Sequence, residues 1–269
     1  MAGVAVNMEG APEASMGVDA ADFDNDGDED LFMTHLLGET NTIYVNDGEG
    51  WFEDRSIATG LAAPSKGYTA FGTAWIDYDN DGWLDLFVAN GDVRVMPILV
   101  KAGDRYPLRQ PNQFFAGGKG RFTDITGQAG AALAVAEVSR GVAVGDLDND
   151  GDSDIVVINS NGPAQLLRNN TGNGNHWLGL TVLNQHEQPA LGARIAIHQG
   201  NGNVLWRRVH VDGSYASASD PRLIVGLGNS PKIEKIEVHW PDATVEEWHN
   251  VRMDRYNVLI SGHGRPVTQ

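Results

Sequence analysis

Three acidic stretches with the same spacing stand out in this sequence. Residues 22–30, 77–85 and 146–154 each read D-x-D-N-D-G-x-x-D. Carboxylates this close together repel one another unless a cation lies between them. Oxygen ligands at alternate positions, a sharp turn and a further Asp suit a hard cation that takes six to eight oxygens. The spacing predicts three calcium sites, because magnesium demands tighter octahedral geometry and retains its waters.

The predicted ligands are the side chains at positions 1, 3, 5 and 9 and the backbone carbonyl at position 7. The glycine at position 6 lets the chain turn back with positive φ. An EF-hand is excluded, because it needs a Glu at position 12 and flanking helices, whereas Met33, Val88 and Val157 occupy that position in strand-like runs. The predicted ligands are Asp22, Asp24, Asp26, Asp28 and Asp30; Asp77, Asp79, Asp81, Trp83 and Asp85; and Asp146, Asp148, Asp150, Asp152 and Asp154.

Composition favours a turn-rich β protein. The 269 residues include 33 Gly and 11 Pro with 41% hydrophobic residues, enough for one large domain or two smaller ones. Three calcium ions would change the formal net charge of −17 to −11. The remaining acidity argues against nucleic-acid or anionic-membrane partners. No apolar run approaches the ~20 residues of a membrane span, and the absence of Cys excludes disulfides.

The repeat extends beyond the acidic loops. Gly17, Gly72 and Gly141 each stand five residues before a first Asp and open a predicted inner strand. A second strand follows each loop, and then a hairpin, at 44–54, 114–124 and, in degenerate form, 167–174. The interval between the second and third units is longer by an insertion near residues 93–111, predicted to be a loop on one rim. Tandem four-stranded units of this length are typical of β-propeller blades.

The pattern G-x-x-x-x-D-x-D-x-D-G-x-x-D-L-x-V resembles the FG-GAP/VCBS repeat of integrin-type propellers, over roughly residues 2–174. The resemblance implies that each calcium loop joins the first two strands of a blade. Beyond residue 175 we expect seven short strands, one of them opening at Gly213. Asn-His-Trp-Leu at 175–178, Gly-Ala-Arg at 192–194, Gly-Ser-Tyr at 213–215, Gly-Leu-Gly at 226–228 and Trp-Pro-Asp at 240–242 resemble the ASPIC/UnbV domain, which follows such repeats in the cartilage acidic protein family.

The predicted fold is therefore all-β. A partial β-propeller of three integrin-like FG-GAP/VCBS blades spans residues 1–174, and an antiparallel β-sandwich spans 175–269. Three blades cannot close a ring, since propellers have four to eight. Residues 1–15 match only the tail of a blade, so we expect a bare flank before Gly17, with the sandwich partly covering the other flank. This predicts self-association or association with a chain that supplies further blades.

No catalytic motif is present. The eight His form no zinc spacing, and neither a nucleophile elbow nor a phosphate loop occurs. Three histidines near strand ends could line a surface pocket: His198, His210 and His239. Partly exposed histidines with a structural role are the favoured interpretation. Arg207 and Arg208 either bind an anion or form an exposed pair on a strand. The exposed pair is the commoner arrangement. The Trp residues are predicted to be core, with a sugar-binding face as the alternative.

The function expected is a calcium-stabilised extracellular interaction or scaffolding module of adhesion type without catalytic activity. It would bind a protein or a glycan. We place the protein outside the cell because such loops suit millimolar calcium. The N-terminal residues lack signal-peptide features, so a signal would lie upstream; a cytoplasmic protein is the alternative. Two other functions stay open: part of a secreted carbohydrate-active enzyme, which a cluster of perturbed ionisable groups outside the loops would favour, and a self-assembling structural subunit.

Overall fold

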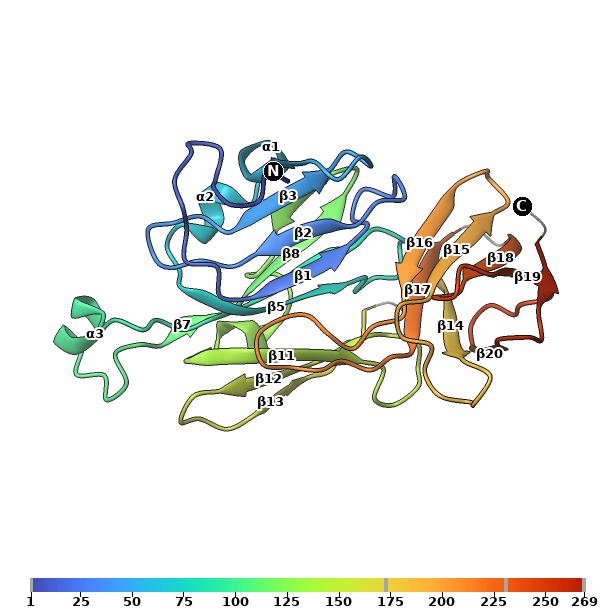
Figure 1. Cartoon of the computed structure of the whole chain (residues 1–269). Coiled ribbons are helices and arrows are strands. Elements are labelled where there is room, and N and C mark those ends of the chain that lie inside the picture. The colour runs from blue at the N-terminus through green and yellow to red at the C-terminus, as the bar shows by residue number, and fades with distance from the viewer. Residues whose placement is uncertain (1, 172–173, 230–231, 268–269) are drawn as a thin grey trace.

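The computed structural model describes residues 2–171, 174–229 and 232–267. The protein is nearly all-β: within the described residues, three blade sheets and a C-terminal pair of sheets form a propeller-like arrangement, and one further sheet has only two strands. Figure 1 shows the blade sheets on the left and the C-terminal pair on the right. No helix among the described residues is long and apolar enough to cross a membrane.

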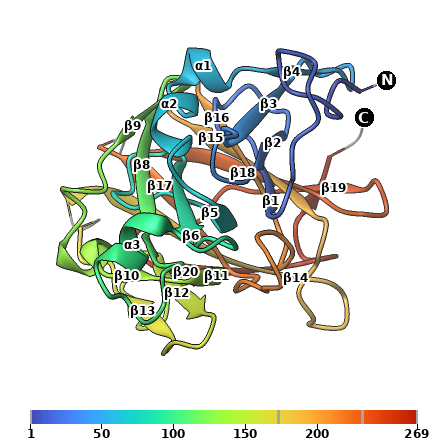
Figure 2. The same ribbon diagram turned by 90° about the vertical axis from the view of Figure 1, so that its left-hand side faces the viewer.

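The three predicted blades are present, each an antiparallel sheet in chain order. Seen from the end that carries α3, the three sheets follow one another around the view (Figure 2). The third blade has three described strands where four were predicted, and residues 172–173 of its expected hairpin lie outside the described residues. The strands are β1 (Val18–Ala21), β2 (Asp30–Met33), β3 (Thr42–Asn46) and β4 (Phe52–Asp54); β5 (Ala70–Ile76), β6 (Asp85–Asn90), β8 (Gln113–Gly118) and β9 (Arg121–Asp124); and β11 (Ser139–Gly145), β12 (Asp154–Asn159) and β13 (Gln165–Leu167).

Alternate residues of each blade face opposite neighbours. In β6, Phe87 packs toward blade 3 and its neighbours Leu86 and Val88 pack toward blade 1, all fully buried. This follows from the two-residue period of a strand. Phe32 and Ile43 of blade 1 complete the first inter-blade core, and residues from β11 and β12, including Val142, Ile155 and Val157, complete the second.

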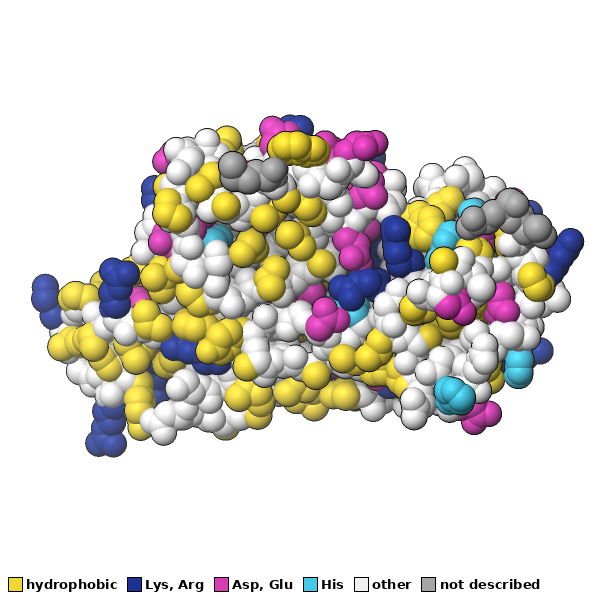
Figure 3. Space-filling model, viewed as in Figure 1, with side chains coloured by type: hydrophobic (Ala, Val, Ile, Leu, Met, Phe, Trp, Pro, Cys, Tyr) yellow, Lys and Arg dark blue, Asp and Glu magenta, His cyan; other side chains and the backbone are white. Residues whose placement is uncertain are grey.

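The insertion predicted at 93–111 forms a projecting arm. It contains α3 (Pro97–Lys101), none of whose residues is buried, and β7 (Gln110–Pro111), which pairs with β10 (Ala136–Glu137). Figure 1 shows α3 projecting from the left end of the molecule, and Figure 3 shows hydrophobic and basic side chains gathered there. The other helices are short: α1 (Ser56–Thr59), α2 (Ala62–Ser65) and the 3₁₀ turn η1 (Ala131–Ala134).

The C-terminal sheets share one apolar core and form a sandwich. Within the described residues one sheet has the order β17-β14-β20 and the other β16-β15-β18-β19-β21. The antiparallel prediction is wrong for one pair, because β14 and β20 run parallel; the long excursion through the second sheet supplies the crossover that a parallel pair requires. The strands are β14 (His176–Leu183), β15 (Arg194–Gln199), β16 (Val204–Arg208), β17 (Leu223–Gly228), β18 (Ile233–His239), β19 (Val245–Trp248), β20 (Tyr256–Ile260) and β21 (Arg265–Pro266).

The strand predicted from Gly213 does not form. Gly213, Ser214 and Ala216 have φ of +127°, +62° and +48°, values incompatible with a strand. Residues 211–220, called here the inserted segment, run along the first strand of every blade instead. Val18 N–H donates to Ser214 O at 3.4 Å, and Thr73 N–H donates to Ser214 Oγ at 3.1 Å. In β11, Val144 accepts Asp220 N–H at 2.9 Å and donates to Ser219 Oγ at 3.1 Å.

The flanks of the blade array differ from the prediction. Residues 2–15 lie against blade 1 and cover part of the flank that was expected to be bare: Tyr44 is buried and its hydroxyl donates to Val6 O at 3.1 Å. Phe52 N–H donates to Ala2 O at 2.8 Å. The outer face of blade 3, in contrast, exposes 52% of Ile158 and 60% of Leu166. The sequence could not show that the N-terminal segment folds back.

Candidate calcium centres

The first Asp of each acidic loop closes the turn by accepting two backbone N–H groups. In the loop at 77–85 (loop 2), Asp77 Oδ1 accepts Asp81 N–H at 3.0 Å and Asp77 Oδ2 accepts Gly82 N–H at 2.9 Å. Asp22 in the loop at 22–30 (loop 1) and Asp146 in the loop at 146–154 (loop 3) accept the equivalent pairs. The glycine at position 6 has a φ between +92° and +102° in the three loops, which only Gly adopts at little cost. The three loops therefore share one backbone fold.

The ninth residue of each loop ties the loop to the next hairpin of its blade. Asp30 Oδ1 accepts Asn46 N–H, Asp85 Oδ1 accepts Gly117 N–H, and Asp154 Oδ1 accepts the N–H of Asn169, each at 2.8 Å. The ninth Asp thus fixes the loop relative to the third strand of the sheet or the residues just after it.

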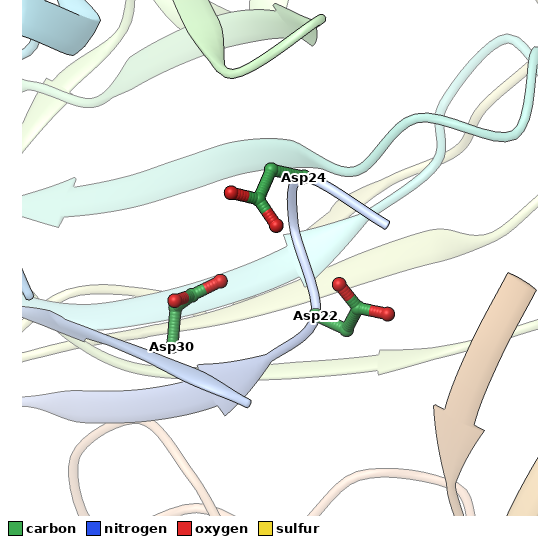
Figure 4. A group of neighbouring side chains, drawn as sticks. All are labelled: Asp22, Asp24 and Asp30. Carbon is green, nitrogen blue, oxygen red and sulfur yellow. The ribbon is translucent and has the colours of Figure 1, made fainter. Parts of the chain in front are cut away.

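Positions 1, 3 and 9 bring their carboxylates together in every loop. The groups are Asp22, Asp24 and Asp30; Asp77, Asp79 and Asp85; and Asp146, Asp148 and Asp154, with one oxygen of each residue within 4.8 Å of the others in its group. Figure 4 shows the first group at the end of β1 and the start of β2. At position 5 one carboxylate oxygen accepts the position-7 N–H, as in Asp81 Oδ1 with Trp83 N–H at 2.8 Å. Ligation through position 5 and through the position-7 carbonyl stays a prediction.

The chemistry of these groups fits a hard divalent cation. Among the described residues, Asp24 Oδ1 and Asp30 Oδ2 are buried and have no hydrogen-bond partner. Burial raises the pKa of Asp77 to about 7, of Asp30 to about 8 and of Asp85 to about 9. Buried carboxylates with raised pKa values and unsatisfied oxygens are stabilised by a cation, which favours their charged form.

The C-terminal sandwich supplies one arginine to each loop. Arg194 donates to Gly27 O of loop 1, and Arg207 donates to Gly82 O of loop 2 at 3.2 Å. Arg222 donates to Asp146 O of loop 3 at 2.9 Å. In addition, the positive charge of Arg207 lowers the pKa values of Asp22 and Asp77 against the effect of burial.

Sequence reasoning missed these arginines. The interpretation of Arg207 and Arg208 as an exposed pair is wrong, because Arg207 meets loop 2 and Arg208 Nε binds Glu29 Oε1 at 2.7 Å. The four predicted carboxylates of each loop carry more negative charge than one calcium ion can neutralise. This indicated that cationic side chains should lie nearby, but only the tertiary fold shows which ones.

A cavity of about 130 Å³ lies where loops and sandwich meet. It is lined by the first Asp of all three loops and by Arg207, Arg208 and Arg222, together with Asp19 and His210. Asp19 lies outside the loops, and burial raises its pKa to about 6. Its carboxylate accepts the N–H groups of Ala20 and Trp75 at 3.0 and 3.3 Å, a structural role in holding β1 beside β5.

The other candidate histidines do not gather in this cavity. His198 Nε2 and His239 Nε2 each lie 3.6 Å from Glu237 Oε2 on the outer face of the sandwich, both partly exposed. Among the Trp residues, Trp240 is buried as predicted, and Trp75 packs on Phe23 and Phe122. Trp51 is exposed at a hairpin tip.

Comparisons with known proteins agree with this architecture. A model of the FG-GAP-like repeat matches residues 22–88, a model of the FG-GAP repeat matches 140–178, and a model named ASPIC and UnbV matches 183–266. The chain carries FG-GAP repeats and an ASPIC/UnbV domain. These matches account for all three loops and most of the sandwich.

The chain is also similar to cartilage acidic protein 1 of several vertebrates. It is 26% identical to the mouse protein over 84% of this chain and 33% of that protein. Identity to the human protein is 26% over 91% of this chain and 35% of that protein. Identity to the Xenopus tropicalis protein is 25% over 85% of this chain and 34% of that protein. The chain thus spans about a third of the length of these relatives.

Proposed function

We propose that the protein is a calcium-binding extracellular interaction module of adhesion type, with calcium in a structural role. The observation that carries this proposal is the threefold recurrence of one loop fold with converging carboxylates at positions 1, 3 and 9. The similarity to cartilage acidic protein 1 supports an extracellular location and a non-catalytic role. The similarity covers only part of those proteins, so their partners do not transfer to this chain.

Calcium would neutralise the carboxylates and hold each loop between two strands of a blade. Positions 1 and 9 of each loop are already fixed by backbone donors, so this chain orients two carboxylates before the ion arrives. A cation bound only by the folded loops stabilises the fold by RT ln(1 + [Ca²⁺]/Kd), about 2.7 kcal/mol per site at a hundredfold excess over Kd.

Isothermal titration calorimetry tests the proposal. We expect three sites per chain and a melting temperature that falls when EGTA removes calcium. A chain that binds no calcium at millimolar concentration, or whose melting curve EGTA leaves unchanged, would contradict it.

A second function, self-assembly, is favoured by the outer face of blade 3. The repeat places Val156, Ile158 and Leu166 at the positions that Phe87, Ala89 and Phe114 occupy in blade 2. In blade 2 these residues are buried against the next blade, whereas in blade 3 Ile158 and Leu166 are exposed. We propose that a second copy of this chain covers this face.

Light scattering at micromolar concentration tests this assembly. Leu166→Glu should shift the protein toward monomer, while Ile98→Glu, which also replaces an exposed hydrophobic residue but lies on the arm, should not. A wild-type monomer would contradict self-assembly through blade 3, and dissociation by Ile98→Glu alone would place the interface on the arm.

A further inference from the structure

The sandwich recognises the backbone of the calcium loops. Besides the three arginines, Asn175 Nδ2 donates to Asp79 O at 2.8 Å, and Gly228 N–H donates to Asn80 O at 2.8 Å. The acceptors in these contacts are loop carbonyls. Their directions depend on the turn that each acidic loop makes, so the docking surface exists only while the loops are folded.

Close packing between the sandwich and the loops also requires the loops to keep their folded turns. A Cβ on Gly226 would lie 2.2 Å from Asp77 Oδ2, and a Cβ on Gly151 would lie 2.0 Å from the Trp177 ring. Tyr256 OH also donates to Asp146 Oδ2 at 2.8 Å. A loop that changes shape therefore separates from the sandwich or collides with it.

The inserted segment lies between the sandwich and the blades. It connects β16 to β17 of the sandwich and contacts the first strands β1, β5 and β11. Gly213 lies against the Asp19 carboxylate, and Ser217 and Asp220 lie close to Gly141 and Gly145 of β11. Other contacts with the blades include hydrogen bonds and the edge-on packing of Tyr215 on Phe71 at 5.0 Å. Hydrogen bonds of this kind contribute little net stability, because they replace hydrogen bonds to water.

We infer that calcium controls the docking of the sandwich on the blades: filled loops hold it, and emptied loops release it together with the inserted segment. The inference rests on the proposed calcium binding. Without the ion, the four carboxylates of a loop repel one another, the loop opens, and its carbonyls no longer face the sandwich. Linkage is reciprocal, so docking in turn raises calcium affinity.

Hydrogen exchange of the full chain, with millimolar calcium or with EGTA, tests the release. We expect EGTA to speed exchange in the inserted segment and at the Thr73 and Val144 amides that bind it. Strands β14 and β15, in the core of the sandwich, should stay protected because release is not unfolding.

Calorimetry on the same samples separates the two proposals. Calcium binding together with unchanged exchange in the inserted segment would overturn the inference and leave the proposed function standing. Equal loss of protection in β14 and β15 would also overturn it, since that result is global unfolding. Absence of calcium binding would overturn both.

Gly213→Val tests the reciprocal effect without touching a predicted ligand. A Cβ at Gly213 would lie 2.5 Å from Asp19 Oδ1, which forces the inserted segment away. The matched control is Gly202→Val, which has a similarly positive φ and no atom within 4 Å of the added Cβ. We expect calcium affinity to fall roughly 5–150-fold for Gly213→Val, the usual span of coupling between sites, and to be unchanged for Gly202→Val. Equal affinities for the two variants would overturn the coupling.

Discussion

Asp30→Asn should stabilise the calcium-free protein at pH 8 even though it removes a predicted calcium ligand. Asp30 is fully buried, and burial raises its pKa from 3.8 to about 8. The folded state therefore binds more protons than the unfolded state between pH 4 and 8. Stability of the calcium-free protein must fall as pH rises through this window.

The size of the effect follows from the pKa shift. At pH 7 the folded Asp30 still holds its proton, whereas the unfolded chain has lost it, and this difference costs the calcium-free fold about 4 kcal/mol relative to low pH, at 1.36 kcal/mol for each pH unit above 3.8. That is a large fraction of a typical domain stability of about 5–15 kcal/mol. If local opening of loop 1 requires less free energy than this, the calcium-free protein opens loop 1 instead of keeping Asp30 buried. Asn removes the charge and keeps an oxygen that can accept Asn46 N–H. The variant should therefore lose most of its pH dependence at this site.

Thermal melts in EGTA from pH 5 to 8.5 measure the difference. We expect the melting temperature of the wild type to fall with pH and that of Asp30→Asn to fall less, so that the variant is the more stable at pH 8. In calcium the order reverses, and calorimetry should count two ions instead of three. Asp47→Asn, at an exposed hairpin tip where the carboxylate also accepts backbone N–H groups, is the matched control. Parallel pH profiles for wild type and Asp30→Asn in EGTA would refute the reasoning.

Three other substitutions test separate parts of the structure. Asp79→Ala should abolish one calcium site and leave two, counted by calorimetry, since each loop draws its ligands from its own nine residues. Phe87→Ala should lower the free energy of unfolding by about 3–5 kcal/mol in a denaturant titration, because Phe87 is fully buried between blades 2 and 3; a loss below 1 kcal/mol would contradict this packing. Gly151→Ala should destabilise the junction and speed hydrogen exchange at β20, because the added Cβ meets the Trp177 ring; unchanged exchange there would contradict the close approach.

The blades and their loops could be predicted because their signal is local. Nine consecutive residues specify each turn, and the Gly five residues earlier marks the first strand, so one repeat explains the next. Comparison of the repeats also predicted the insertion at 93–111, because it lengthens the spacing between the second and third units. The degenerate hairpin predicted at 167–174 is only partly described: the described residues contain no fourth strand, and residues 172–173 lie outside them.

The contacts between the sandwich and the blades could not be predicted, because they join residues far apart in sequence. Gly-Ser-Tyr at 213–215 carries the alternation of a strand, yet its backbone takes positive φ and binds the blades. The parallel pairing of β14 with β20 depends on where the chain returns after five other strands. No local pattern distinguishes an arginine that faces solvent from one that faces a loop carbonyl.

The charges at the junction connect the proposed calcium binding with the docking of the sandwich. Each loop offers four carboxylates at positions 1, 3, 5 and 9, and one calcium ion offsets only half of their charge. The sandwich adds one arginine per loop, on a carbonyl where it does not compete with the ion for the converging oxygens. A bound calcium ion would leave these four carboxylates with two negative charges, and the sandwich arginine would reduce this to one. Calcium and the sandwich arginine together would therefore offset most of the charge of these four carboxylates, which favours burial of the first and ninth Asp of every loop.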